Sequence, residues 1–141
     1  MTVAPNTFKR APRKTRRSAA PGEKKTILIY SPDLNFCFSL STLFQDRYNV
    51  ITTTNPGMLQ TSVRHYPADL LIEDAPPSDA ILQQLDGLRR FSKNLPIIML
   101  YVYDPKGIQW EPRIRDCVDS VFYKPFDIAL LSRRIDELLP A

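Results

Sequence analysis

Two side chains of opposite charge, Asp74 and Lys124, are the residues of this sequence most suited to chemistry. The stretch ADLLIEDAPPSD (68–79) is an aliphatic run that ends on Glu73-Asp74 and is broken at once by two prolines. A carboxylate at the end of an apolar strand costs desolvation energy unless something uses it. Asp74 is therefore either a reactive group or one half of an ion pair with Lys124, which would itself stabilise the structure.

Other residues with reactive side chains offer less. Ser31 precedes Pro32 and Asp33, which favours a helix start over a catalytic serine, because no histidine base is near. The one histidine, His65, falls near the end of a predicted helix and is expected at the surface. The two cysteines lie 80 residues apart without a CxxC spacing, a pattern that favours a reducing compartment over a disulfide framework.

Short apolar runs alternate with helical patterns from residue 26 onward. The predicted strands are 26–30, 48–54, 69–74, 95–102 and 120–123. The predicted helices run from Ser31 to about Arg47, from Pro56 to about Tyr66, from about Ser78 to Ser92, and over 128–138, where apolar residues recur at three-and-four spacing. The segment 103–117 contains two prolines and a glycine, so any helix there is short or displaced.

These alternating elements predict a doubly wound α/β domain. Strands that are continuously apolar are buried on both faces, which indicates a parallel sheet covered by helices on each side. Ligand sites in such sheets form beyond the carboxyl ends of the strands. The pattern therefore brings Ser31, Asp74, Tyr101 and Lys124 to one edge.

Three segments together resemble the receiver domain of bacterial two-component response regulators. ADLLIED resembles its third strand, PIIML its fourth, and FYKPF followed by DIALLSRRIDELL its fifth strand and last helix. With TILIY at the start, the resemblance covers about residues 25–139 in order. It implies a flavodoxin-like sheet of five strands in the order 2-1-3-4-5, here with an irregular or shortened fourth helix.

The resemblance implies roles for three residues. Asp74 falls on the phospho-acceptor, which receives a phosphoryl group from a histidine kinase or a phosphotransfer protein. Lys124 falls on the lysine that pairs with this aspartate and with the phosphoryl oxygens. Pro125 follows it at the place where the family usually has a cis peptide bond, which is tolerated before proline.

The sequence departs from the family at the metal site. The first strand of a receiver normally ends in two acidic residues that hold Mg²⁺, and here those positions are Ser31 and Pro32. Asp74, with Asp33 and Glu73 on the predicted pocket rim, would be the remaining carboxylates. Mg²⁺ prefers hard oxygen ligands in octahedral geometry, so we expect no firm metal site and at most weak Mg²⁺ binding through Asp74.

Three further departures affect the rest of the pocket. Tyr101 replaces the small hydroxyl residue that the resemblance implies at the end of the fourth strand, and Val121 replaces the switch aromatic three residues before the lysine. The proline expected four residues after the aspartate is Ser78. A site with the aspartate and the lysine but without the acidic pair has the profile of an atypical receiver, or pseudo-receiver.

Residues 1–25 differ in composition from the rest of the chain. They carry a net charge of +7, whereas the remaining 116 residues carry −3. Their low apolar content predicts a disordered basic tail before a receiver-like domain over 26–141. Such a tail could contact nucleic acid or a membrane surface through counterion release, could be an Arg-rich organelle-targeting segment, or could serve only as a solubilising extension.

Two functions from different classes remain open at this point. The first is a stand-alone receiver in a phosphorelay, which acts by protein–protein interaction with a kinase, a phosphotransfer protein or a downstream target. The second is a phosphorylation-independent pseudo-receiver that serves as a docking or homodimerisation module. Neither is an enzyme. No apolar run is long enough to span a membrane, and we expect a cytoplasmic protein.

Overall fold

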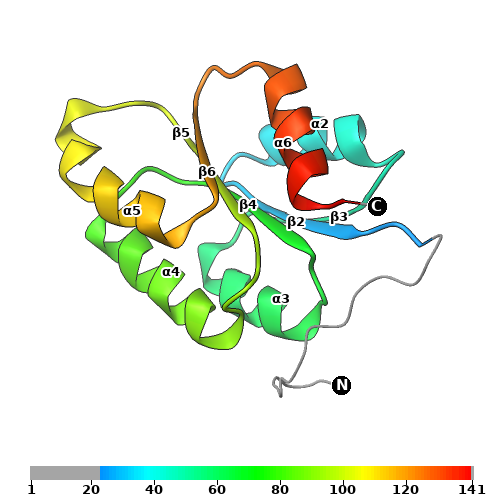
Figure 1. Cartoon of the computed structure of the whole chain (residues 1–141), viewed down its shortest axis with the longest axis horizontal. Coiled ribbons are helices and arrows are strands. Elements are labelled where there is room, and N and C mark those ends of the chain that lie inside the picture. Colours follow the sequence, from blue (N-terminus) through cyan, green and yellow to red (C-terminus); the bar gives the residue numbers. More distant parts are fainter. Residues whose placement is uncertain (1–22, 141) are drawn as a thin grey trace.

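The sheet has five parallel strands in the spatial order β3-β2-β4-β5-β6 within residues 23–140, which the computed structural model describes (Figure 1). The strands are β2 (Thr26–Tyr30), β3 (Asn49–Thr53), β4 (Leu70–Asp74), β5 (Ile97–Tyr101) and β6 (Ser120–Tyr123). Counted along the chain, this order is 2-1-3-4-5, so the predicted fold class is confirmed. Each strand ends at the same edge of the sheet, where β4 contributes Asp74.

Helices cover both faces of the sheet. On one face lie α2 (Leu34–Phe44) and α6 (Ile128–Leu138), and on the other α3 (Leu59–His65), α4 (Asp79–Phe91) and α5 (Glu111–Cys117) (Figure 1). Side chains alternate along each strand, so Leu71 packs in the α3–α5 layer while Leu70 and Ile72 pack in the α2–α6 layer. Every residue of β4 and β5 is buried, as expected for central parallel strands. Burying each such aliphatic side chain contributes about 1.5–3 kcal/mol.

The start of α2 differs from the predicted one. The cap is Asp33, whose Oδ1 accepts hydrogen bonds from the backbone N–H groups of Asn35 at 2.9 Å and Phe36 at 3.3 Å. Ser31, predicted as the cap, is instead completely buried at the end of β2. Its hydroxyl is engaged elsewhere, so the acidic side chain two residues later takes the capping position.

The end of α2 was also predicted wrongly, since the helix ends at Phe44 and not near Arg47. The residues that follow make contacts with α6: Arg47 Nη1 lies 2.7 Å and Tyr48 Oη 2.6 Å from Asp136 Oδ1. Desolvation and this hydrogen bond raise the pKa of Tyr48 to about 12. A tertiary contact of this kind overrides local helix propensity.

The two connections around the sheet that contain Pro-Gly or Pro-x-Gly begin as 3₁₀ turns. Turn η1 (Pro56–Met58), capped by Asn55, precedes α3, and turn η2 (Pro105–Trp110), capped by Asp104, precedes α5. Helix α5 has seven residues, which confirms the prediction of a short helix in this region. The predicted helix from Ser78 is α4, and the Ser78 hydroxyl caps it by accepting from the Ile81 N–H at 3.1 Å.

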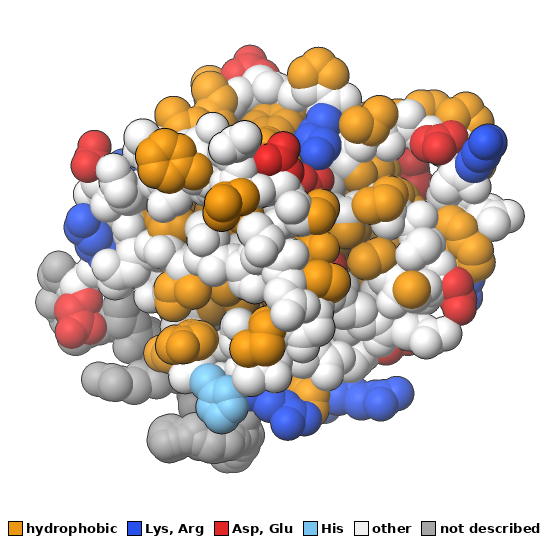
Figure 2. Space-filling view, turned by 180° about the vertical axis from the view of Figure 1, so that it is seen from behind, with side chains coloured by type: hydrophobic (Ala, Val, Ile, Leu, Met, Phe, Trp, Pro, Cys, Tyr) orange, Lys and Arg blue, Asp and Glu red, His pale blue; other side chains and the backbone are white. Residues whose placement is uncertain are grey.

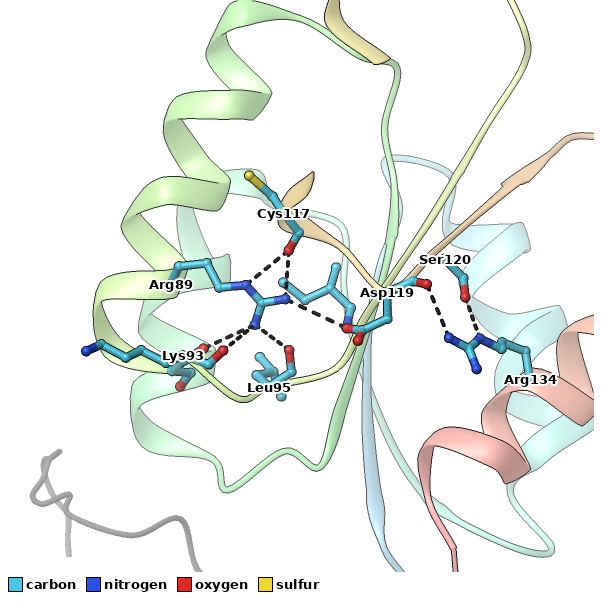
Figure 3. Close-up of polar contacts among 9 residues, drawn as sticks. Arg89, Lys93, Leu95, Cys117, Asp119, Ser120 and Arg134 are labelled. Atoms are coloured by element: carbon cyan, nitrogen blue, oxygen red, sulfur yellow. Dashed lines mark hydrogen bonds and ion pairs between the residues drawn. The ribbon is translucent and has the colours of Figure 1, made fainter. Parts of the chain in front are cut away.

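One arginine joins the loops at the edge of the sheet opposite Asp74 (Figure 3). Arg89, from the last turn of α4, donates to the carbonyl oxygen of Cys117 at 2.7 Å from Nη2 and to that of Lys93 at 3.2 Å from Nη1. It also donates to the carbonyl of Leu95 and forms an ion pair with Asp119 at 3.7 Å. The planar guanidinium suits such a fork of acceptors, and it ties the end of α4 to the start of β5 and to the turn before β6.

Most of the predicted tail lies outside the described residues, which begin at Glu23. The two lysines that follow Glu23 are described and contact the domain. Lys24 Nζ donates to the Gln45 carbonyl at 3.1 Å, and Lys25 Nζ to the Pro140 carbonyl at 2.8 Å. In the part of the chain from 23 to 140, no helix is both long and apolar enough to cross a membrane.

Candidate functional site

Asp74 and Lys124 form an ion pair at the carboxyl edge of the sheet. Lys124 Nζ lies 2.7 Å from Asp74 Oδ1, and the two residues are 50 positions apart in the sequence. The Asp74 side chain is only 8% exposed, whereas that of Lys124 is 30% exposed. A buried carboxylate needs both a counter-charge and hydrogen-bond donors to offset its desolvation, and Lys124 provides the charge.

The second oxygen of Asp74 accepts a hydrogen bond from the residue that follows β2. The Ser31 hydroxyl donates to Asp74 Oδ2 at 2.7 Å and accepts the backbone N–H of Asp33 at 3.0 Å. The serine thus links the carboxylate to the first turn before α2. Both oxygens of Asp74 therefore have a protein donor within 2.7 Å.

Lys124 is held from more than one side. Its ammonium lies 5.0 Å from the centroid of the Phe36 ring, within the range of a cation–π contact. Phe36 in turn packs edge-on against Phe126, with ring centroids 6.3 Å apart. The peptide bond between Lys124 and Pro125 is cis. These contacts aim the lysine at Asp74 from the loop between β6 and α6.

Glu73 does not join this pair, although it is adjacent to Asp74 in sequence. Neighbouring residues of a strand point to opposite faces, and Glu73 faces the α3–α5 layer beside Tyr30. It is completely buried, and among the described residues neither of its oxygens has a hydrogen bond of good geometry. Desolvation raises the pKa of Glu73 to about 8, and the nearby Gln84 opposes this only in part.

Tyr101 also lies on the α3–α5 side of the sheet. Its ring is buried and packs edge-on against Tyr123, with centroids 5.7 Å apart. The Tyr123 hydroxyl donates to Glu111 Oε1 at 2.7 Å and accepts from Arg115 Nη2 at 3.1 Å. Desolvation raises the pKa of Tyr101, with the Glu111 charge as the next cause. The residues at the ends of β5 and β6 thus form a packed aromatic cluster where the resemblance implies a small hydroxyl.

Glu111, Arg115 and Tyr123 were not singled out from the sequence. Tyr123 immediately precedes Lys124, and this adjacency is the one sequence signal that could have drawn attention to it. Glu111 and Arg115 are one turn apart on α5 and 3.6 Å apart in space, but only the fold brings them to the end of β6.

The carboxylates present do not fit a Mg²⁺ site. The residue next to Asp74 just after β2 is Ser31, and its hydroxyl is occupied by Asp74 and by the backbone. Asp33 uses its carboxylate to cap α2, and Glu73 faces the other side of the sheet. Within residues 23–140, no three side chains among His, Cys, Asp and Glu are grouped so that they could hold a metal ion. Mg²⁺ would be left with Asp74 as its one protein carboxylate.

Comparisons with known proteins support the architecture through structure alone. No family model matches the chain, and no curated protein matches it. Among solved structures, a response regulator receiver protein from Pseudomonas putida superposes with a TM-score of 0.69 at 17% identity, over 82% of this chain and 98% of that one. The chemotaxis protein CheY4 of Vibrio cholerae gives a TM-score of 0.69 at 20% identity, over 83% and 100% of the two chains.

A third similar structure comes from a different setting. A protein of Burkholderia pseudomallei described as pilus assembly-related has a TM-score of 0.67 at 22% identity, over 81% of this chain and 88% of that one. At these identities the similarity is one of fold. The chain has the CheY-like, flavodoxin-like fold of receiver domains, and an Asp–Lys pair at the edge where ligand sites of such sheets form.

Proposed function

We propose that this chain is a receiver-like signalling domain that acts by binding other proteins and has lost metal-dependent phosphoryl transfer to Asp74. The proposal rests on one observation above all, the pairing of both Asp74 oxygens with Ser31 and Lys124. In this arrangement the carboxylate is a structural group that joins β4 to β2 and to the loop after β6. It corresponds to the pseudo-receiver of the sequence interpretation.

Charge explains why this arrangement disfavours phosphorylation. Transfer of a phosphoryl group places a dianionic donor beside an anionic nucleophile, and a metal ion normally neutralises that charge. Ser31 supplies a neutral hydroxyl where a metal-binding carboxylate is implied by the resemblance, and Asp33 is committed to the helix cap. Lys124 is then the one cation in direct contact with Asp74 in the described part of the chain.

The names of two structural neighbours are compatible with a phosphorylated receiver and with a pseudo-receiver. The Pseudomonas putida protein is named as a response regulator receiver, and the Burkholderia pseudomallei protein as pilus assembly-related. By analogy of fold, we propose a protein partner for this chain and binding, not catalysis, as its activity.

Phosphorylation of Asp74 is the second candidate function. The observation that favours it is the Lys124–Asp74 distance of 2.7 Å, because the same lysine can pair with a phosphoryl group once one is present. In this case the partner would be a histidine kinase or a phosphotransfer protein. Asp74 would have to give up its hydrogen bond from Ser31 when it accepts the phosphoryl group.

A phosphoryl mimic distinguishes the two candidates. The full chain is incubated with Mg²⁺ and either acetyl phosphate or beryllofluoride, and intact mass and Trp110 fluorescence are followed. Trp110 is partly buried against the core next to α5, so it reports on rearrangement at this end of the sheet. We expect no change in mass or fluorescence that depends on Asp74. A dependent change would be lost in Asp74→Asn and kept in the control Asp79→Asn, which alters an exposed carboxylate. An Asp74-dependent mass increase or fluorescence change in the wild-type chain would refute the proposal.

A substitution that restores a carboxylate sharpens this test. Ser31→Asp places a second acid beside Asp74 at the end of β2, where the serine oxygen now lies 2.7 Å from Oδ2. Two like charges at this distance repel unless a cation lies between them. We therefore expect the variant to be destabilised without Mg²⁺ and to gain thermal stability on its addition, whereas the wild-type chain gains none. A wild-type chain stabilised by millimolar Mg²⁺ to the same extent would contradict the proposal.

A further inference from the structure

One side of the domain carries almost no charge. Residues 34–63 span α2, β3, η1 and most of α3, and among these 30 residues only Asp46 and Arg47 are charged. For the whole chain the charged fraction is 24%. Arg47 is turned towards α6, where it pairs with Asp136 at 2.7 Å. Asp46 is exposed between α2 and β3, and every other side chain of this stretch is neutral.

Large apolar side chains are exposed on this side. Leu34 and Phe38 are one helical turn apart on α2 and are 69% and 71% exposed, and Met58 of η1 is 45% exposed. Figure 2 shows this side of the molecule, with orange and white surface over α2, β3 and α3 and most charged groups nearer the rim. Exposed apolar residues scattered singly need no explanation, but a neutral face that collects several of them indicates an interaction surface.

The strand at this side has a free edge. β3 pairs with β2 through residues 49–53, and no strand of the described chain covers its other edge. The segment VITTT (50–54) is β-branched throughout, with neither proline nor charge. Natural proteins usually protect such an edge with lysine, proline or a bulge, since its unpaired N–H and C=O groups can template another strand. The opposite edge strand, β6, is flanked by the charged residues Arg115, Lys124 and Arg134.

We propose that the surface formed by α2 and the free edge of β3 binds a second copy of this chain, by antiparallel pairing of β3 with β3. A neutral surface pairs without burying an unpaired charge only if its partner is also neutral, and this chain's own α2–β3 surface meets that condition. An isologous two-fold interface uses the same surface on both subunits, and two strand edges related by a two-fold axis are antiparallel. The basic residues 1–22 do not fit as the occupant, because they would place lysine and arginine against neutral groups.

The geometry of the two-fold pair also separates the two copies of Lys25. The chain before residue 23 leads into Lys25, whose carbonyl accepts from the N–H of Asn49 at the start of β3. In an antiparallel pair the two β3 starts lie at opposite ends of the shared strands, about 17 Å apart for five residues. This distance exceeds the Debye length of about 8–10 Å at physiological salt, so the two copies of Lys25 repel each other little.

This inference deepens the proposed docking function, because it names one partner, but it does not depend on Asp74. If Asp74 accepts a phosphoryl group and the chain still dimerises through β3, only the proposed function fails. If the chain is monomeric and inert to beryllofluoride, only the present inference fails.

Sedimentation velocity of the full chain from about 1 µM to about 1 mM tests the pairing. Thr52 is exposed on β3, and Thr52→Lys brings two lysines within a Debye length across the two-fold axis. We expect a reversible wild-type dimer and a dissociation constant raised at least about tenfold by this variant. Phe38→Glu on α2 should have the same effect by a different route. The control, Leu130→Glu, alters an apolar residue that is 47% exposed on α6 and should leave the dimer unchanged.

Two further measurements make the result specific. Hydrogen exchange of the β3 amides should slow as the protein concentration rises, because pairing covers them, whereas the β6 amides should not respond. The dimer should persist from low to high salt, since the surface is neutral. A monomer at every concentration would overturn the proposal. So would a dimer lost at high salt, which would indicate association through charge, or one weakened by Leu130→Glu as much as by Thr52→Lys.

Discussion

Glu73 is predicted to make the stability of this domain depend strongly on pH. Its carboxyl is completely buried, and desolvation raises its pKa from 4.5 to about 8. The folded chain therefore keeps a proton that the unfolded chain releases once the pH exceeds about 4.5. Because the unfolded state then binds fewer protons, the free energy of unfolding falls as the pH rises towards 8 and is constant above it.

The magnitude follows from the size of the shift. A difference of one bound proton gives a slope of about 1.4 kcal/mol per pH unit. Between pH 5 and pH 7 the stability due to Glu73 should thus fall by about 3 kcal/mol, a large part of the 5–15 kcal/mol typical of a domain. Glu73→Gln has the same shape and no ionisable group, so this variant should lack the decline.

Urea unfolding of both proteins at pH 5, 6, 7 and 8 measures the effect. The free energy of unfolding of the wild type minus that of Glu73→Gln should fall steadily over this range, and taking this difference removes the contribution of every other group. Glu137→Gln is the control, since the Glu137 side chain is 55% exposed and should give a constant difference. A wild-type minus Glu73→Gln difference that stays constant within about 0.5 kcal/mol would show that burial does not hold the proton on Glu73.

The remaining predictions concern the other charged contacts. A double-mutant cycle of Asp74→Asn and Lys124→Met, measured by urea unfolding, should give a coupling energy of about 1–3 kcal/mol, and a value near zero would mean that the pair contributes nothing to the fold. Arg89→Lys should lower the free energy of unfolding by about 2–3 kcal/mol, since an ammonium cannot reach the same set of carbonyls, and unchanged stability would contradict the structural role of the guanidinium. Glu111→Gln should lower the pKa of Tyr123, which the hydrogen bond to Glu111 chiefly raises, and ultraviolet titration at alkaline pH measures it; an unchanged titration curve would argue against that bond.

The sheet could be predicted from the sequence because its strands are short, continuously apolar and separated by clear breaks. Strands β2 and β6 have the predicted bounds, and the Asp74–Lys124 pair follows from the rule that parallel strands end at the same edge. The helix boundaries were harder. The Ser31 hydroxyl bonds to Asp74, 43 residues away, so a cap assignment based on neighbouring residues chose the wrong side chain.

The contents of the site were predictable only in part. Glu73 was expected on the pocket rim because it adjoins Asp74, but the alternation of side chains along β4 places it in the opposite layer. Tyr101 ends β5 at the expected edge, and its ring likewise packs into that layer. The bond between Tyr123 and Glu111 joins β6 to α5 across an irregular connection, and no local pattern encodes such a contact.

The bonds of Arg89 have a consequence for local unfolding. Because one side chain holds the end of α4, the start of β5 and the turn before β6, none of these segments can open without breaking bonds that the others share. They should therefore unfold as one cooperative unit, with amide protons that exchange only on global unfolding. Residues 102–106, at the other edge, are exposed and begin a 3₁₀ turn, so their amides should exchange through small local openings. The opening motions at the two edges of the sheet would then differ in rate by orders of magnitude. The slow edge would stay folded while the fast edge opens and closes.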